Sequence, residues 1–273
     1  MGGRVFEYGD RVILVTETGN RFSFLIRKGQ LFHSTDGYFK ADDIVGLEEG
    51  GEALSNTGRR GVVFHPSLFE QLLLLPRRTQ VTYPKDVGFI LVLADVRPGS
   101  RIVEGGLGTG VLALFLSAHA YPTGKVYSYD LNDELFAAVS RQAERMGLGN
   151  ILVLKKGDIS REVEETDVDA FIADIPEPWT AVDQAKRALR GGGMFVAIVP
   201  TVEQLTKTCE ALRAAGFLEY FSGELLIRPW RVKEGMTRPH HVSRAHTVFI
   251  AAARKTLLSD LSDWVLRLPD GFR

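Results

Sequence analysis

A glycine-rich turn between two apolar segments constrains the fold of this chain more than any other feature. Residues 101–105 have the pattern of a buried strand, residues 106–110 carry a glycine at every second position, and residues 111–118 begin an apolar helix. Glycines let the backbone turn sharply and approach a ligand closely, and the amides at a helix N-terminus favour electronegative ligand atoms. A second strand, 124–129, ends at Asp130, where an acid commonly binds ribose hydroxyls. The sequence therefore predicts a site for a nucleoside cofactor.

The spacing of the glycines separates two kinds of cofactor. A dinucleotide fingerprint requires a small residue at the position of Val111, so that pattern is not met. Gly106, Gly108 and Gly110, with Glu104 two residues ahead, instead resemble the first motif of class I S-adenosylmethionine methyltransferases. An ordinary tight turn between a strand and a helix is the alternative. The resemblance implies cofactor contacts from Glu104, Gly106, Leu107, Gly108, Thr109, Gly110, Asp130, Asp158 and Asp174.

Two of these acids follow strands. Asp130 ends the strand 124–129, and Asp158 lies beyond the short strand 151–154. In class I methyltransferase folds, an acid at the position of Asp158 accepts a hydrogen bond from the adenine amino group of the cofactor. A loop acid or a helix cap would place the same residue there, so Asp158 alone does not decide between these roles.

Composition excludes several classes of protein. The 273 residues allow one large domain or two small ones. No apolar run approaches the roughly 20 residues that span a bilayer, so we expect no membrane segment. The single cysteine, Cys209, excludes an internal disulfide framework and suits a reducing cytoplasm. No His/Cys cluster has zinc spacing, so we expect no metal site.

The charge of the chain carries no global signal for nucleic acid. The formal net charge is −1, whereas nucleic-acid-binding domains are commonly strongly basic. Basic residues do cluster locally. Each cluster can be a solvated face, or together they can form one basic surface. The clusters are Arg59-Arg60, Arg77-Arg78, Lys155-Lys156, and the run Arg228, Arg231, Lys233, Arg238 and Arg244.

The chain divides into a β-rich part and an α/β part. We expect a small β-barrel-like domain over residues 1–60, with a flexible crossing that includes 50–51 and 57–61. From residue 61 to 255 helical and strand patterns alternate, which predicts a mostly parallel, Rossmann-like α/β sheet covered on both faces. Residues 256–273 form a tail of unknown role. In the β-rich part the expected strands are 11–16, 21–26, 30–33 and 44–46. In the α/β part the expected helices include 85–96 and one from Thr180 to Gly191. An antiparallel pair of strands, 217–227 with 246–253, is expected to close the sheet of that part.

The segment after the fourth strand of this sheet carries the chemistry. Residues 168–173 read as a buried strand, and Asp174 follows directly. Ligands in open α/β sheets lie beyond the carboxyl ends of the strands, so Asp174 is expected where the transferred group emerges. Pro176 and Pro178 stiffen the loop. A structural turn with Trp179 packed as core is the alternative.

These segments together resemble the tRNA (adenine-58-N1)-methyltransferase family over nearly the whole length. The similar segments are 65–68, 77–86, 174–179, 200–204 and 246–247. The resemblance implies a homotetramer that uses S-adenosylmethionine to methylate N1 of an adenine in the T-loop of tRNA, at position 58 and, in one alternative, also at the neighbouring adenine. It implies two catalytic residues: Asp174, which orients the base through its N6 amino group, and Tyr83, which stacks on the extruded base. A core position is the alternative for Tyr83.

The chain departs from the family pattern at three positions. Leu107 stands where the family usually has Thr, Glu177 where it has Asp, and Asp130 where it commonly has Glu. Leu107 lacks the hydroxyl and offers only its backbone amide to the cofactor. Two other functions therefore stay open: a non-catalytic tRNA-binding subunit of the same fold, and another class I methyltransferase such as a protein-isoaspartate type.

Overall fold

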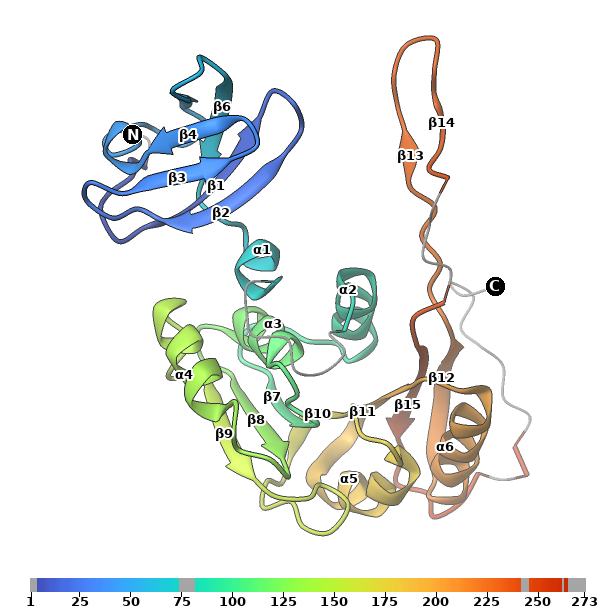
Figure 1. The fold of residues 1–273 in the computed structure, drawn as a ribbon. Helices are drawn as coiled ribbons and strands as arrows, with labels where there is room; N and C mark the ends of the chain where they lie inside the picture. The colour runs from blue at the N-terminus through green and yellow to red at the C-terminus, as the bar shows by residue number, and fades with distance from the viewer. Residues whose placement is uncertain (1–3, 74–81, 242–245, 262, 265–273) are drawn as a thin grey trace. The chain divides into compact units, whose positions relative to one another are not determined.

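The computed structural model describes residues 4–73, 82–241, 246–261 and 263–264. The chain forms two compact units, Met1–Leu74 and Leu75–Arg273 (Figure 1). Each unit has its own sheet and its own buried core. Within the described residues no helix is long and apolar enough to cross a membrane.

The first unit consists of antiparallel strands around a small apolar core. Its four-stranded sheet has the order β2-β1-β6-β5, and β3 pairs with β4 as a separate hairpin. Phe6, Leu14, Phe39 and Ile44 are fully buried between them. The elements are β1 (Arg11–Thr16), β2 (Arg21–Leu25), β3 (Leu31–Ser34), β4 (Gly37–Lys40), the 3₁₀ helix η1 (Ala41–Asp43), β5 (Glu52–Leu54), β6 (Arg60–Phe64) and helix α1 (Leu68–Leu73).

Three expectations for this unit differ from the structure. Of the residues expected to form a flexible crossing, Arg60 and Gly61 instead begin β6, and Gly61 lies in the sheet opposite Thr16. A Cβ at Gly61 would come within 2.6 Å of a methyl carbon of Leu14, so this glycine serves close packing and not a loop. Residues 44–46 form a turn after η1 and not a strand. The two units divide after Leu74, whereas we expected the boundary after residue 60.

The second unit contains a seven-stranded sheet of order β12-β15-β11-β10-β7-β8-β9. Strands β7 to β11 are parallel, and β15 runs antiparallel to both β11 and β12. This confirms the predicted mostly parallel sheet with an antiparallel closing pair. Its strands are β7 (Arg101–Gly105), β8 (Lys125–Asp130), β9 (Leu152–Lys156), β10 (Val168–Ala173), β11 (Leu189–Val199), β12 (Phe217–Gly223) and β15 (Phe249–Lys255).

Helices cover both faces of this sheet. Phe171 and Phe195 belong to the apolar cluster that includes residues of α5 and α6. Ile172 and Val196, which alternate with them along β10 and β11, are also fully buried, and successive strand residues point to opposite faces. The helices are α2 (Pro84–Leu93), α3 (Val111–Ala120), α4 (Phe136–Arg145), the 3₁₀ helix η2 (Pro178–Ala181), α5 (Val182–Ala188) and α6 (Val202–Ala214).

The boundaries of two helices differ from the prediction. Helix α2 ends at Leu93, three residues early, and Asp95 then adopts the left-handed conformation with φ 51°. Helix α5 ends at Ala188, and the glycines that we expected to follow a helix lie inside β11. The reason is that Leu189 already pairs with Val168 of β10.

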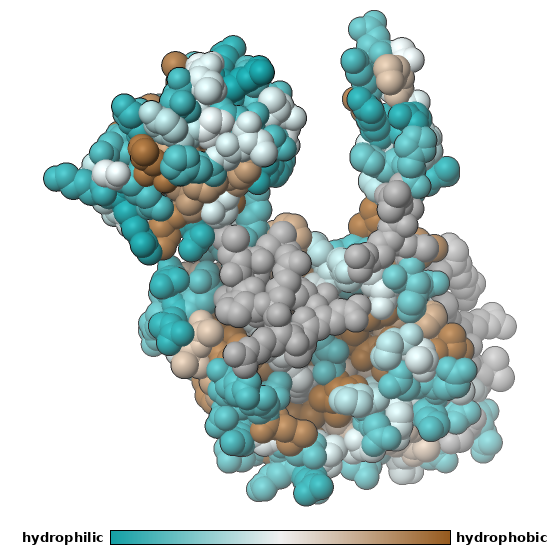
Figure 2. All heavy atoms as spheres, in the orientation of Figure 1, coloured by the Kyte–Doolittle hydropathy of each residue, from teal (hydrophilic) through white to brown (hydrophobic). Residues whose placement is uncertain are grey.

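A long hairpin connects β12 to β15. It carries the short strands β13 (Trp230–Arg231) and β14 (Arg238–Pro239), which pair only with each other among the described strands. Figure 1 shows this hairpin extending beyond the sheet of its own unit. Figure 2 shows its outer part as mainly hydrophilic, although Val232 there is 79% exposed.

Candidate active site

The predicted site residues gather at the carboxyl ends of β7, β8 and β10. Strand β7 lies in the middle of the sheet, with β8 and β9 on one side and β10 and β11 on the other. The strand order changes direction here, and such a switch point is where open α/β sheets bind ligands. Glu104 is near the end of β7, Asp130 ends β8, and Asp174 follows β10.

The glycine loop, residues 106–110, packs tightly against the neighbouring strand ends. The amide of Gly108 donates to Asp130 Oδ2 at 3.1 Å. Gly106 has φ 92°, and a Cβ there would come within 2.0 Å of the main-chain oxygen of Asp174. Only glycine fits this conformation and this space, so the loop packs between Asp130 and Asp174. We call the ligand-binding position beyond these strand ends the crevice.

The backbone amide of Leu107 makes a hydrogen bond within the protein. Its amide donates to the carbonyl oxygen of Tyr129 at 3.3 Å, next to the bond from Gly106 to the same oxygen at 2.9 Å. In this structure the Leu107 amide is therefore held by the end of β8, and its contact with a cofactor stays a prediction. The side chain of Leu107 and that of Thr109 are both buried.

Glu104 is a buried acid with one oxygen satisfied. Ser128 Oγ donates to Oε2, whereas Oε1 is buried and has no hydrogen-bond partner among the described residues. Burial raises the pKa of Glu104 to about 8, and the nearby charges of Asp174 and Asp130 act in the same direction. A buried polar atom without a partner is costly, so Oε1 marks a position for a ligand atom.

Asp130 and Asp158 have different surroundings. Asp130 accepts from the amide of Asn132 at 2.9 Å besides that of Gly108. Asp158 Oδ1 accepts from both the amide and the hydroxyl of Ser160, at 2.9 and 2.6 Å, and these bonds lower the pKa of Asp158. A cofactor would therefore have to share the Asp158 carboxylate with Ser160.

Asp174 is half-buried at the other side of the crevice. Its amide donates to the oxygen of Gly105 at 2.9 Å, which continues the pairing of β10 with β7. Thr82 Oγ1 donates to Asp174 Oδ2 at 3.4 Å. Burial raises the pKa of Asp174 to about 6, although the hydroxyl of Thr82 opposes this rise.

The loop that carries Asp174, residues 174–179, is held by helix α6 as well as by its prolines. Gln204 Nε2 donates to the oxygen of Pro176 at 2.8 Å. Lys207 Nζ lies 5.1 Å from the centre of the Trp179 ring, within the range of a cation–π contact. Thr201 caps α6 by accepting from the amide of Gln204. The contact of Gln204 with the loop was not predicted.

Tyr83 lies at the start of α2. Its carbonyl oxygen accepts from the amides of Asp86 and Val87, both at 2.9 Å, and its side chain is half-buried. Tyr83 follows Thr82 directly, so the backbone that carries it lies beside Asp174. The preceding part of the family-like segment, residues 77–81, lies outside the described residues, as does Arg244 of the basic run.

Sequence reasoning missed three contributors to this site. Ser128 stands opposite Glu104 in the register of β7 and β8, and a polar residue in a buried strand next to an acid was a usable signal. Thr82 and the buried pair of Lys85 and Asp86 gave no such signal, because their partners are distant in the sequence.

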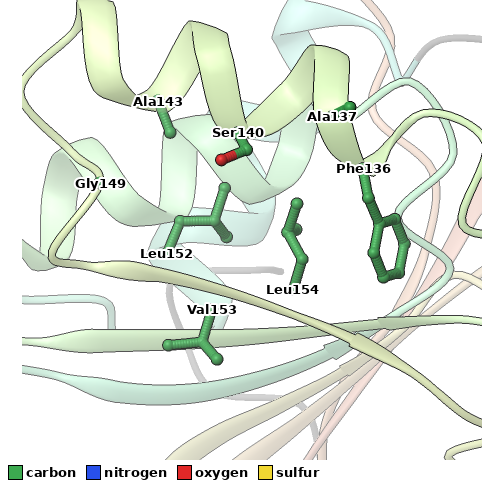
Figure 3. Close-up of a pocket in the computed structure, with 8 residues that line it drawn as sticks. All are labelled: Phe136, Ala137, Ser140, Ala143, Gly149, Leu152, Val153 and Leu154. Carbon is green, nitrogen blue, oxygen red and sulfur yellow. The ribbon is translucent and has the colours of Figure 1, made fainter.

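A cavity of about 460 Å³ lies elsewhere, between helix α4 and the edge strand β9 (Figure 3). None of the nine predicted cofactor residues lines it. Figure 3 shows Leu152 and Leu154 pointing towards the helix. The cavity is lined by Phe136, Ala137, Ser140, Ala143, Gly149, Leu152, Val153 and Leu154.

Comparison with known proteins identifies the family. Residues 63–255 match the family described as "tRNA methyltransferase complex GCD14 subunit", and residues 5–51 match "TrmI-like N-terminal". This chain belongs to the tRNA (adenine-58-N1)-methyltransferase family. The resemblance inferred from the sequence is thereby confirmed.

Two curated relatives and a solved structure are similar to this chain. A tRNA (adenine(57)-N(1)/adenine(58)-N(1))-methyltransferase of Methanocaldococcus jannaschii is 33% identical over 270 residues, covering 89% of this chain and 94% of the relative. A tRNA (adenine(58)-N(1))-methyltransferase of Thermus thermophilus is 29% identical, covering 89% and 96%. The crystal structure of a SAM-dependent O-methyltransferase from Thermotoga maritima has a TM-score of 0.88 at 31% identity, covering 93% and 96%. These findings confirm the class I methyltransferase fold and S-adenosylmethionine as the cofactor.

The residues of the crevice fit S-adenosylmethionine. This cofactor carries an ammonium group and ribose hydroxyls, which are all hydrogen-bond donors. Glu104 Oε1 is a buried acceptor without a partner among the described residues, and Asp130 lies at the position of a ribose-binding acid. Because Gly106 has no Cβ, the main chain of Asp174 packs directly against the glycine loop. Glu104, Asp130 and the glycine loop would therefore hold the cofactor.

Proposed function

We propose that this chain methylates N1 of an adenine in the T-loop of tRNA, at position 58, with S-adenosylmethionine as methyl donor. The observation that carries the proposal is the half-buried carboxylate of Asp174, which follows β10 at the switch point of the sheet, next to the glycine loop. The relatives support the substrate, because their names specify N1 of adenine 58 in tRNA. Catalysis is assigned to the second unit.

Methyl transfer to N1 requires that the adenine be correctly oriented and that the positive charge developing on its ring be compensated. The N1 atom of adenine carries a lone pair at neutral pH, so no strong base is needed. Bound S-adenosylmethionine supplies an electrophilic methyl group. Asp174, with a pKa of about 6, is mostly ionised at pH 7 and accepts a hydrogen bond from the N6 amino group. Its charge orients the base and offsets the positive charge that develops on the ring.

Tyr83 is proposed to stack on the target base. The T-loop adenine has to leave its stack before it can enter the crevice, and extrusion costs a few kcal/mol. Stacking on an aromatic ring returns roughly 1–3 kcal/mol per base. The position of Tyr83, next to the residue that contacts Asp174, supports this role.

We further propose that the protein is a homotetramer and that it acts in the cytoplasm, where its tRNA substrate is found. The hairpin between β12 and β15 supports self-association, because it exposes Leu226, Ile227 and Val232, the last by 79%. Exposed apolar residues on a protruding element commonly mark a protein interface. Light scattering of the wild type should give the mass of four chains, and Val232→Glu is expected to lower it. A wild-type mass of one chain would contradict the tetramer.

Nucleoside mass spectrometry tests the proposed reaction. Unmodified tRNA incubated with the protein and S-adenosylmethionine should yield 1-methyladenosine, and a transcript with guanine at position 58 should not. If a transcript with adenine only at position 57 also reacts, two neighbouring adenines are substrates. Absence of 1-methyladenosine from every transcript would refute the proposal.

The same measurements separate the other functions. A non-catalytic subunit would bind no S-adenosylmethionine in a calorimetric titration, whereas the proposed enzyme binds it with micromolar affinity. An isoaspartate methyltransferase would label an isoaspartyl peptide and not tRNA. The Thermotoga maritima relative is described as an O-methyltransferase, and a ribose 2′-O-methyl product is distinguishable from 1-methyladenosine by its fragments.

A further inference from the structure

A buried ion pair in the first turn of helix α2 contacts Thr247, which lies two residues before β15. Lys85 Nζ donates to Asp86 Oδ1 and to Thr247 Oγ1, both at 2.6 Å, and Thr247 Oγ1 donates to Asp86 Oδ2 at 2.7 Å. Asp86 has no exposed surface, and the side chain of Lys85 is only 10% exposed. Because loss of one partner would leave a buried charge uncompensated, this closed set of contacts holds the first turn of α2 in one place.

The ion pair lies at the edge of the sheet from which Asp174 emerges. Phe249, two residues after Thr247, pairs with Val199 at the end of β11. Ala173, which precedes Asp174, pairs with Ala197 two residues before that end. The start of α2 is therefore fixed at the catalytic edge of the sheet, although it comes from a distant part of the chain.

Thr82 connects this anchored helix to Asp174. The carbonyl of Tyr83 accepts from the amides of Asp86 and Val87, so the backbone that precedes α2 is continuous with its first turn. From there Thr82 Oγ1 donates to Asp174 Oδ2 at 3.4 Å. The main chain of Asp174 is fixed separately by its bond to Gly105. The carboxylate is thus oriented from the side of α2 by one hydroxyl group.

We propose that Thr82 is a positioning residue for Asp174, and that the contacts among Lys85, Asp86 and Thr247 hold Thr82 in place. The hydroxyl occupies Oδ2 and leaves Oδ1 to accept from the amino group of the adenine. This inference rests on the proposed function of Asp174 and adds to it the residue that sets the direction of its carboxylate. Thr82 does not touch the methyl donor or the base.

The test compares Thr82→Val, which keeps the shape and removes the donor, with Thr82→Ser, which keeps the hydroxyl. We expect kcat of Thr82→Val to fall about three- to tenfold, the effect of one hydrogen bond. The acid limb of kcat/KM should move to higher pH, because the hydroxyl lowers the pKa of Asp174. Glu104 also faces Asp174 from β7, and both variants leave it unchanged. Thr82→Ser should recover most of the rate, and affinity for S-adenosylmethionine should stay at the wild-type value in both.

A second pair of variants tests the anchor. Thr247→Val removes the contact between helix and strand, and Thr247→Ser keeps it. We expect Thr247→Val to move the acid limb in the same direction as Thr82→Val, by a smaller amount, with Thr247→Ser close to wild type. A Thr247→Val protein that melts at lower temperature but keeps the wild-type pH profile would overturn the role of the anchor.

The outcomes separate this inference from the proposed function. If the wild type forms no 1-methyladenosine, the proposed function fails. If the wild type is active and Thr82→Val keeps both the wild-type kcat and the wild-type pH profile, only the role of Thr82 fails. A loss of S-adenosylmethionine binding in Thr82→Val would also overturn it, since that would indicate a general structural role.

Discussion

The two sides of the crevice are built in different ways. On the cofactor side the contacts are short in sequence: Ser128 reaches Glu104 over 24 residues, and the amide of Gly108 reaches Asp130 over 22. On the substrate side Thr82 reaches Asp174 over 92 residues, and Lys85 reaches Thr247 over 162. The cofactor side is one strand–turn–helix–strand unit, whereas the substrate side exists only once the whole sheet is formed. Changes on the first side should affect cofactor affinity, and changes on the second should affect the rate.

The largest expected effect is on the substrate side. Asp174→Ala should lower kcat by about 10²–10³, roughly 3–4 kcal/mol, because one preorganised electrostatic partner of the transition state is lost. Binding of S-adenosylmethionine, followed by calorimetry, should persist. Glu177→Gln removes an exposed carboxylate from the same loop and should retain wild-type activity. An Asp174→Ala enzyme with a near-normal rate would end the assignment of this residue and the contrast between the two sides.

The matching change on the cofactor side is Gly106→Ala. The new Cβ would come within 2.0 Å of the oxygen of Asp174, at a φ of 92° that favours glycine. We expect affinity for S-adenosylmethionine to fall about tenfold or more, which corresponds to at least about 1.4 kcal/mol. Gly88→Ala is the control, since nothing lies within 4 Å of its Cβ and its helical backbone is unstrained. If calorimetry gives equal affinities for both variants, the glycine loop is not the cofactor site.

Tyr83 tests whether the substrate side also binds the base. If its ring stacks on the adenine, Tyr83→Ala should lower kcat/KM about tenfold, within the range of one stacking contact. Tyr83→Phe keeps the ring and should remain active. Steady-state kinetics with tRNA measure both. Equal losses in the two variants would indicate a role for the hydroxyl, and no loss in either would remove Tyr83 from the site.

The pH dependence distinguishes the two buried acids. Burial raises the pKa of Asp174 to about 6, and the ionised form is the one that accepts from N6. Activity should therefore be full well above pH 6 and fall as the pH drops through 6, to about a tenth at pH 5. Asp174→Asn should lack this limb, while its residual rate stays low. A wild-type limb near pH 8 would instead indicate control by Glu104, whose pKa is about 8.

The same difference in sequence separation explains what could be predicted. The glycine loop, Asp130 and the mostly parallel sheet follow from local patterns, and the structure places them accordingly. The role of Gly61 could not be predicted, because only its packing on Leu14 shows why a glycine lies in a strand. Thr82 is an ordinary residue in its local sequence. Its importance comes from a contact over 92 residues, and no local pattern encodes that.

The smallest expected effect concerns the loop that joins Asp174 to α6. Gln204→Met keeps the length of the side chain but removes the donor to Pro176 and the acceptor of the Thr201 hydroxyl, whereas the amide of residue 204 can still donate to Thr201. Loss of the bond to the loop should lower kcat about threefold, without a change in cofactor affinity, because Gln204 lies on the substrate side. Thr206→Val removes an exposed hydroxyl of the same helix that bonds only to Val202 among the described residues, and it should leave kcat unchanged. If Gln204→Met instead weakens S-adenosylmethionine binding, the two sides of the crevice are coupled through this loop, and the separation between affinity and rate does not hold.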